Sequence, residues 1–198
     1  TQKNLYGMGK AKHWWSSFNY DEAELDSSYV SQVLEPFAER LKMNIKAPVV
    51  LDLGVGKGET SVMLQTKGLK TVKLDISWNG LLGQDNSVVA TGWKLPFPDD
   101  SFDGIHSKDM MTHIPLKLRR KLFSELYRVM KPGGIALICS ANESGEDVLH
   151  QYPTYKNDLL TSGMEMGLIL ESSTDWKPTN KSKDWLWGKQ RFVLELKK

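Results

Sequence analysis

Residues 49–63 (VVLDLGVGKGETSVM) constrain the fold more than any other segment of the chain. Residues 49–53 are aliphatic except for Asp52, which is typical of a parallel strand that is buried on both faces. The pattern of residues 60–64 then predicts a helix, whose free N–H groups point toward the carboxyl end of the strand. Between the two lie three glycines, which allow a sharp turn and a close approach of a ligand to the backbone: Gly54, Gly56 and Gly58. This strand, loop and helix predict a site for a small polar ligand.

The spacing within the loop indicates which ligand it suits. A dinucleotide fingerprint, G-x-G-x-x-G, needs a third glycine where this chain has Glu59, and a carboxylate there disfavours a pyrophosphate. The acids on both sides of the loop, Asp52 and Glu59, suit a ligand that carries a positive group. A second strand pattern at residues 71–77 (TVKLDIS) contains Asp75, which is placed to accept hydrogen bonds from both hydroxyls of a ribose. A ribose with a cationic tail predicts S-adenosylmethionine.

Two further segments extend this pattern toward a known family. Residues 88–115 (VVATGWKLPFPDDSFDGIHSKDMMTHIP) and residues 126–143 (LYRVMKPGGIALICSANE) follow in family order and with family spacing. The chain resembles the class I S-adenosylmethionine-dependent methyltransferases, in the small-molecule branch that includes the ubiquinone and menaquinone C-methyltransferases. The resemblance implies an α/β fold with a doubly wound, mostly parallel seven-stranded sheet, the Rossmann-like methyltransferase fold. It also implies an antiparallel C-terminal strand and an N-terminal helical cap. The product formed from the cofactor would be S-adenosylhomocysteine.

The organisation of the chain predicts one domain over residues 1–198. Residues 1–46 form an aromatic and helical cap, residues 47–143 the cofactor-binding core, and residues 144–198 an insertion with closing strands. Two late strands are expected from the segments LILESSTDW and RFVLELKK. A helix in the cap is predicted by the spacing of Tyr29, Val33, Leu34, Phe37, Ala38 and Leu41.

The resemblance implies roles for individual residues at the cofactor. It places Asp52 and the glycine loop against the methionine part, with Asp52 acting through water on the ammonium group. It assigns Asp75 to the ribose hydroxyls and Ile76 to the adenine ring. Ser107 and Lys108 match positions that border the methionine and the transferred methyl, although a solvated, outward-pointing Lys108 is an equal alternative.

One segment departs from the family pattern. Where the family commonly has an acid that accepts from the adenine amino group, residues 90–92 read ATG. Thr91, followed by Gly92, offers a hydroxyl acceptor without charge, so this contact is expected to be weaker. Trp93 could compensate by stacking on the purine, and packing in the core is an equal alternative. Modest cofactor affinity is the expectation.

The expected chemistry needs no fixed catalytic residue. A nucleophile attacks the methyl carbon in line with sulfur, so alignment and desolvation supply most of the acceleration. A base helps where the nucleophile loses a proton. The candidates are His113, Asp109 and Tyr20, with His13 and His150 behind them. His113 leads because it follows the fourth predicted strand, and a packed structural histidine is the alternative.

The methyl acceptor is predicted to be a small molecule that the sequence does not name. Aromatic residues gather near both ends of the chain, where they could form a lid over the cofactor or be buried in the core. These are Trp14, Trp15, Trp185 and Trp187, with Tyr152 and Tyr155 in the late insertion. A cofactor-binding module without catalysis stays open, because the loop predicts a ligand and not a turnover.

Composition weighs against other partners. A net charge of +2, from 26 basic and 24 acidic residues, gives weak steering toward nucleic acid. An RNA or protein methyltransferase stays the alternative, because the tail is basic and residues 117–121 (KLRRK) cluster charge. No apolar stretch approaches the ~20 residues that span a bilayer, and no leader pattern is seen, which predicts a cytoplasmic protein. Cys139 is the one cysteine, expected to be buried and structural, and no metal site is predicted.

Overall fold

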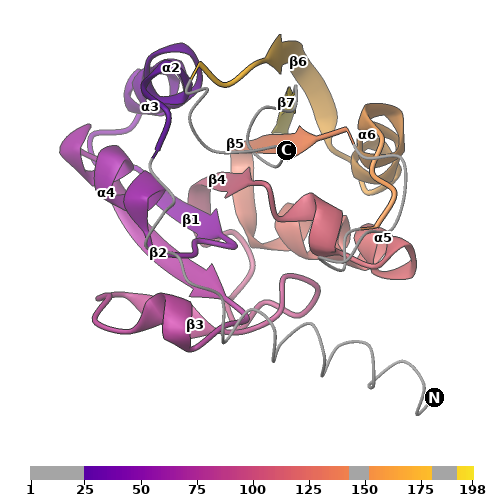
Figure 1. Cartoon of the computed structure of the whole chain (residues 1–198), viewed down its shortest axis with the longest axis horizontal. Helices are drawn as coiled ribbons and strands as arrows, with labels where there is room; N and C mark the ends of the chain where they lie inside the picture. Colours follow the sequence, from indigo (N-terminus) through magenta and orange to yellow (C-terminus); the bar gives the residue numbers. More distant parts are fainter. Residues whose placement is uncertain (1–24, 143–151, 180–190) are drawn as a thin grey trace.

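The aliphatic run at residues 49–53 forms the central strand of a seven-stranded sheet. The computed structural model describes residues 25–142, 152–179 and 191–198. The strand order is β3-β2-β1-β4-β5-β7-β6, which confirms the predicted doubly wound arrangement (Figure 1). The strands are β1 (Val49–Leu53), β2 (Lys70–Asp75), β3 (Ser87–Val89), β4 (Phe102–Lys108), β5 (Met130–Ala141), β6 (Ile169–Trp176) and β7 (Arg191–Lys197).

The last strand runs against the others, as predicted. β7 pairs antiparallel with both of its neighbours, β5 and β6, whereas β1 to β5 pair in parallel. β7 therefore lies between two strands that precede it in the chain. The Pro-Gly-Gly segment at residues 132–134 falls inside the bounds of β5, and the β4–β5 register shifts between Phe102 and Gly104 at the same place.

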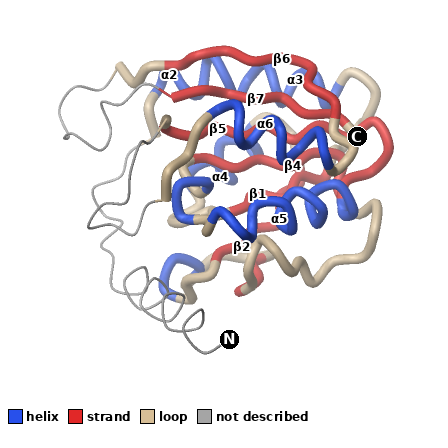
Figure 2. Tube along the Cα trace, turned by 90° about the vertical axis from the view of Figure 1, so that its right-hand side faces the viewer, coloured by secondary structure: helices blue, strands red, loops and turns tan. Residues whose placement is uncertain are grey.

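Helices cover both faces of the sheet. In Figure 2, α5 and α6 lie across one face. Leu51 and Leu53 of β1 share a core cluster with Leu122 of α5, while Val50 shares the other cluster with Phe37 of α3. This alternation is what a strand buried on both faces produces. The helical segments are α2 (Ser27–Tyr29), η2 (Val30–Leu34), α3 (Glu35–Lys42), α4 (Glu59–Thr66), η3 (Asn79–Leu81), η4 (Met111–His113), α5 (Leu116–Val129) and α6 (Lys156–Glu165).

The cap helix is confirmed, with an irregularity that the sequence analysis missed. α2, η2 and α3 follow one another from Ser27 to Lys42, and η2 is a π-helical segment in which the N–H of Glu35 donates to the carbonyl of Val30. An α-helix advances about 100° per residue, so residues spaced by four drift around it by about 40° at each step. The wider π turn offsets that drift. It keeps one stripe of side chains buried, namely Tyr29, Val33, Phe37 and Leu41.

The β2–β3 connection differs from the expected alternation of strands and helices. Only residues 76–86 separate the two strands, and they contain the short 3-10 turn η3 instead of a long helix. Trp78 and Leu82 in this connection are exposed. The connection therefore stays close to the carboxyl end of β2, beside the predicted ligand site.

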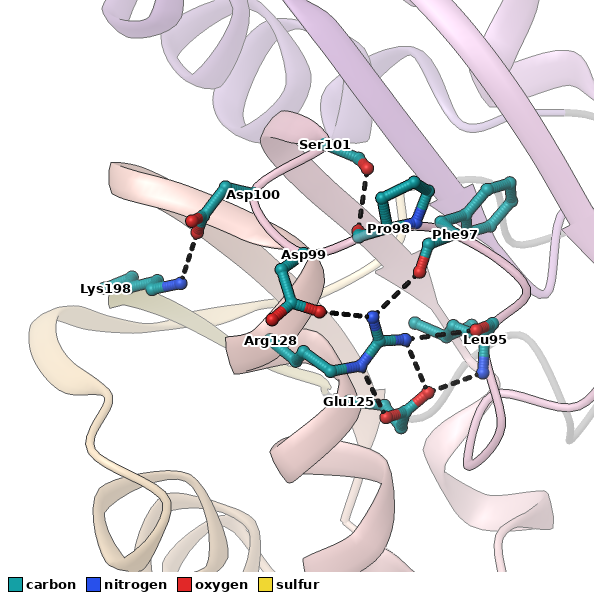
Figure 3. A network of polar contacts seen from close by, with 9 residues as sticks. All are labelled: Leu95, Phe97, Pro98, Asp99, Asp100, Ser101, Glu125, Arg128 and Lys198. Atoms are coloured by element: carbon teal, nitrogen blue, oxygen red, sulfur yellow. Dashed lines mark hydrogen bonds and ion pairs between the residues drawn. The ribbon is translucent and has the colours of Figure 1, made fainter.

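A polar network fastens the turn before β4 to α5 (Figure 3). Arg128 donates to the carbonyls of Leu95 and Phe97 and to the carboxylates of Asp99 and Glu125. The second Glu125 oxygen also accepts from the N–H of Leu95 at 2.7 Å. These contacts raise the pKa of Arg128, chiefly through Glu125, so the guanidinium stays charged. One side chain thus holds the turn in place.

We expect Arg128→Met to lower the free energy of unfolding by about 2 to 3 kcal/mol, because two carbonyls lose their donor and two charged contacts are broken. Arg120→Met on the same helix is the matched control. Arg120 is mostly exposed and pairs with Glu165, so its loss should cost less than about 0.5 kcal/mol. Urea denaturation measures both variants, and equal losses would contradict the role of the network.

Candidate functional site

The glycine loop after β1 has a backbone that side chains would disrupt. Its three glycines all have positive φ, at 74° for Gly54, 53° for Gly56 and 85° for Gly58. A Cβ on Gly54 would lie 2.8 Å from Met110 Cβ, and one on Gly58 would lie 2.3 Å from Gln84 Oε1. The loop therefore needs glycine for its dihedral angles and for the space around it.

The loop and Asp75 meet at the carboxyl edge of the sheet. Asp75 ends β2, and its Oδ2 accepts a hydrogen bond from Gly56 N at 3.0 Å. Its Oδ1 accepts from Ser77 N at 2.8 Å. Burial raises the pKa of Asp75, while the backbone donors of Ser77 and Gly56 act in the opposite direction. The two features that predicted a ribose and a cationic tail thus lie next to each other.

Strand order explains why a ligand site belongs here. The chain places β2 and then β3 on one side of β1, and β4 on the other, so the order reverses between β1 and β4. In open α/β sheets a crevice forms at such a reversal, outside the carboxyl ends of the strands. The glycine loop follows β1 at this edge, and Lys108 ends β4 at the same edge.

Asp52 is directed into the protein. It is 2% exposed, and its Oδ2 accepts from Ser61 Oγ at 2.6 Å. Its Oδ1 lies 2.7 Å from Nδ1 of His106, whose Nε2 lies 2.9 Å from the hydroxyl of Tyr29. The sequence analysis missed Ser61 and His106. The sequence signal was the histidine in the predicted fourth strand, and the β1–β4 register pairs it with Asp52.

Gln84 is a second residue that the sequence analysis missed. Its Nε2 donates to the carbonyl of Gly56 at 2.9 Å and to the carbonyl of Gly80 at 2.6 Å. A Cβ on Gly80 would lie 3.3 Å from the oxygen of Gly56, so η3 touches the glycine loop. The side-chain amide of Gln84 therefore links the loop to the short β2–β3 connection.

The residues predicted at the adenine lie beside the end of β2. Ile76 is half-buried directly after Asp75, and Ala90 N donates to the Asp75 carbonyl at 3.1 Å. Thr91, also half-buried, forms an isolated bridge with Lys94. A Cβ on Gly92 would lie 2.7 Å from Leu122 Cδ1, and half-buried Trp93 packs against the core. These contacts give Gly92 and Trp93 a packing role that needs no ligand.

Charged groups gather after β4. Lys108 Nζ lies 2.9 Å from Asp109 Oδ2, and Arg191 Nε lies 2.6 Å from Asp109 Oδ1. The Lys108 side chain is 18% exposed, so it is not the solvated side chain that was the alternative. Burial raises the pKa of Asp109, but Lys108 and Arg191 outweigh it and hold that pKa well below its usual range. Such a carboxylate is a weak base, which argues against Asp109 in that role.

The remaining predicted residues, which include the other base candidates, are placed as follows. His113 ends η4, where it is half-buried, and the neighbouring Thr112 carbonyl accepts from Tyr152 N at 2.6 Å. Ser107 is buried in β4. Tyr155 is exposed just before α6. Several predicted residues lie outside the described part of the chain: Tyr20, His13, His150, Trp14, Trp15, Trp185 and Trp187.

The basic cluster on α5 is not one exposed face. Arg119 is 2% exposed, and it donates to the Ile114 carbonyl and to Thr154 Oγ1. Arg120 pairs with Glu165 at 3.1 Å. Arg119 therefore supports the structure, and the cluster offers less charge to an RNA than its sequence suggests. Among the described residues, no group of His, Cys, Asp and Glu is arranged to hold a metal ion.

Comparison with known proteins points to one family. Residues 51–138 match the family described as "Methyltransferase domain". This part of the chain is therefore similar to methyltransferase domains. A ubiquinone/menaquinone biosynthesis C-methyltransferase of Marinomonas is 29% identical over 142 residues, which cover 64% of this chain and 55% of that protein. The chain spans between about a third and just over half of the length of five curated relatives that it matches.

Solved structures share the fold at low identity. A 1,6-didemethyltoxoflavin-N1-methyltransferase of Burkholderia thailandensis matches with a TM-score of 0.71 and 16% identity, over 98% of this chain and 89% of that one. A [4+2]-cyclase matches with a TM-score of 0.64 and 14% identity, over 84% of this chain and 81% of that one. The domain's fold is thus used by proteins described with different reactions, and the reaction has to be argued from the site.

We expect Asp75→Asn to weaken the binding of S-adenosylhomocysteine by about tenfold to a hundredfold, because a neutral amide accepts ribose hydroxyls less strongly than a carboxylate. Asp75→Ala would bind still more weakly. It should also cost about 1 to 3 kcal/mol of stability, because Gly56 N and Ser77 N lose their acceptor. Calorimetry measures the affinities. Asp85→Asn is a matched control, since Asp85 is exposed and pairs with Lys73, and it should leave the affinity unchanged.

The same carboxylate predicts a pH dependence. Burial raises the pKa of Asp75 above its ordinary value of 3.8, and ligand hydroxyls favour the ionised form. Affinity should therefore be full above that raised pKa and fall as the pH drops through it, at a higher pH than an ordinary aspartate would give. Asp75→Asn should lack this component. A parent affinity that stays constant down to pH 3.8 would contradict the assignment.

Cys139 is buried in β5, as predicted. It is 0% exposed, and burial together with Asp109 raises the pKa of its thiol to about 12. We expect iodoacetamide at pH 8 to label the folded protein far more slowly than the urea-unfolded protein, because the thiolate is scarce and covered. Since Cys139 is the one cysteine, mass spectrometry reads the result directly. Equal labelling rates would contradict the burial.

Proposed function

We propose that this chain transfers a methyl group from S-adenosylmethionine to an N, O or C nucleophile of a small-molecule acceptor. The observation that carries the proposal is the hydrogen bond between Gly56 N and Asp75 Oδ2. It holds a carboxylate beside a glycine loop at the strand-order reversal, where a nucleoside with an extended tail fits. The similarity of residues 51–138 to methyltransferase domains supports the same reaction.

The acidic residues at the site favour this cofactor over a dinucleotide. Glu59 begins α4, so a carboxylate occupies the first turn of the helix on which a pyrophosphate would have to bind. Asp75 adds a second acid at the same edge. S-adenosylmethionine, when bound, supplies a methyl carbon made electrophilic by a sulfonium group. A cation next to acids is favourable, whereas two phosphates would be repelled.

The proposed roles of the individual residues are consistent with their positions. The backbone of Gly54 and Gly56 approaches the methionine part, and Asp75 accepts the ribose hydroxyls. Ile76 contacts one face of the adenine, and Thr91 accepts from its amino group. Ser107 and Lys108, at the end of β4, border the methyl. Asp52, with both oxygens bonded inside the protein, shapes the loop without contacting the cofactor.

Methyl transfer in this site depends on alignment. The acceptor atom has to approach the methyl carbon in line with the bond to sulfur, and holding the two reactants in place supplies a large part of the rate. An acceptor that must lose a proton needs a base, and His113 is the described candidate, since Lys108 and Arg191 keep Asp109 a weak base. Tyr20 remains a candidate outside the described residues.

The acceptor is proposed to be small. The relatives reported above are described as a C-methyltransferase of ubiquinone/menaquinone biosynthesis and as a 1,6-didemethyltoxoflavin-N1-methyltransferase. The buried Arg119 weakens the RNA alternative. No helix among the described residues is both long enough and apolar enough to cross a membrane. A cytoplasmic location stays a prediction from the sequence.

The cyclase with this fold makes binding without methyl transfer a second candidate. We expect calorimetry to show binding of S-adenosylmethionine and S-adenosylhomocysteine, with no binding of NAD or NADP at the same concentrations. Equal or tighter NAD binding would overturn the cofactor assignment. Incubation of the protein, S-adenosylmethionine and a cell extract should then add one methyl group to a metabolite, as read by mass spectrometry. Tight cofactor binding without any methylated product from small-molecule, tRNA or peptide pools would favour the second candidate.

A further inference from the structure

A buried chain of hydrogen bonds joins the cap helix to the helix after the glycine loop. It runs from the Tyr29 hydroxyl to His106 Nε2 at 2.9 Å, and from His106 Nδ1 to Asp52 Oδ1 at 2.7 Å. It ends with Ser61 Oγ, which donates to Asp52 Oδ2 at 2.6 Å. None of the four side chains is more than 2% exposed. Tyr29, at one end of this series of hydrogen bonds, is therefore too buried to touch a ligand.

The donors and acceptors of this chain fit together in one direction. A carboxylate at Asp52 can only accept, so the Ser61 hydroxyl and the N–H at His106 Nδ1 both donate to it. A neutral His106 then has an acceptor at Nε2, to which the Tyr29 hydroxyl donates. Burial raises the pKa of Tyr29 well above its ordinary value, so it keeps this proton. In this neutral form, the tautomer of His106 is set by its two partners.

Asp52 and Ser61 lie on the two sides of the glycine loop. Asp52 belongs to β1, just before Gly54, and Ser61 belongs to the first turn of α4, just after Gly58. Their hydrogen bond closes the ends of the loop. His106, on the neighbouring strand β4, fixes the second oxygen of Asp52. Whatever orients His106 therefore also orients the clamp on the loop.

The cap helix is anchored at the residue that touches His106. Trp176 Nε1 donates to Ser28 Oγ at 3.0 Å, and the rings of Trp176 and Tyr29 lie 5.0 Å apart. The π segment begins directly after Tyr29, and π turns within helices often occur at functional sites. Tyr29 is therefore held from β6 on one side and bonded to His106 on the other.

We propose that Tyr29 is a positioning residue for the cofactor loop. Acting through His106, it fixes the carboxylate of Asp52 and with it the spacing between β1 and α4. Residues 54–58 then hold the backbone conformation that the cofactor needs before the cofactor arrives. The inference rests on the proposed function, since it concerns affinity for the S-adenosyl ligand.

The test is a double-mutant cycle on the binding of S-adenosylhomocysteine, measured by calorimetry far below the melting temperature. Tyr29→Phe removes one hydroxyl, and we expect about tenfold weaker binding, the effect of one hydrogen bond to a buried group. In His106→Asn, the amide N–H replaces the donor to Asp52 but cannot reach Tyr29. Tyr29→Phe should therefore have no further effect in the His106→Asn background.

Two measurements separate positioning from general stability. Tyr127→Phe removes a hydroxyl from a half-buried tyrosine on the α5 side of the sheet, and it should leave the affinity unchanged. The iodoacetamide labelling rate of Cys139, which lies in the same core cluster as Tyr29, should stay slow in Tyr29→Phe and show that the cap remains docked. Weaker binding with rapid Cys139 labelling would mean that the cap has detached, and would overturn the proposal.

Other outcomes are equally decisive. If the parent protein binds S-adenosylhomocysteine and Tyr29→Phe binds it equally well, the inference is overturned but the proposed function is not. Additive losses in the cycle also overturn it, because Tyr29 would then act by another route. If His106→Asn fails to fold, Ser61→Ala replaces it, since it opens the clamp at the other end and should likewise abolish the effect of Tyr29→Phe. Parent protein that does not bind overturns the proposed function and the inference with it.

Discussion

The parallel pairing of β1 with β2 is the constraint on which the site depends. The register places Leu53 opposite Leu74, so both strands end at the same level and the residues that follow them meet. The glycine loop comes after one strand, and Asp75 ends the other. A shift of one residue would turn Asp75 to the other face of the sheet, because side chains alternate along a strand. Core packing on both faces therefore fixes the ligand site as well as the fold.

Most of the fold could be predicted from local pattern. Apolar runs gave the strands, and the spacing of Tyr29, Val33 and Phe37 gave the cap helix, because each of these side chains is buried. The π segment could not be predicted, since an α-helix buries nearly the same residues. The 3-10 turn at η3 also went unpredicted, although residues 76–86 are too few for a long helix.

The site likewise has a part that the sequence predicts and a part that it does not. The meeting of the loop and Asp75 was predictable, because the carboxyl ends of adjacent parallel strands share an edge. The inward bonds of Asp52 were not, because His106 becomes its neighbour only through the pairing of β1 with β4. Arg191 belonged to a basic tail in the sequence, and the antiparallel β7 brings it to Asp109. Contacts that depend on the register between distant strands are the ones that local pattern does not contain.

Stability alone does not explain the buried polar groups on the cap side of the sheet. Burying charged and polar side chains costs free energy that apolar residues of similar volume would not cost, so such groups are weak support for stability alone. In this structure Asp52, His106 and Tyr29 lie under the glycine loop, and Asp109 with Arg191 lies at the end of β4.

Asp109 also has a φ of 57°, a conformation that is costly for a residue other than glycine. Strain and buried charge thus coincide at the edge where the strand order reverses. At the opposite end of the sheet, Asn86 and Asp100 also have positive φ, but both are exposed. At Asp109 this conformation coincides with an ion pair to the buried Arg191, which is expected where one edge of a sheet binds a ligand.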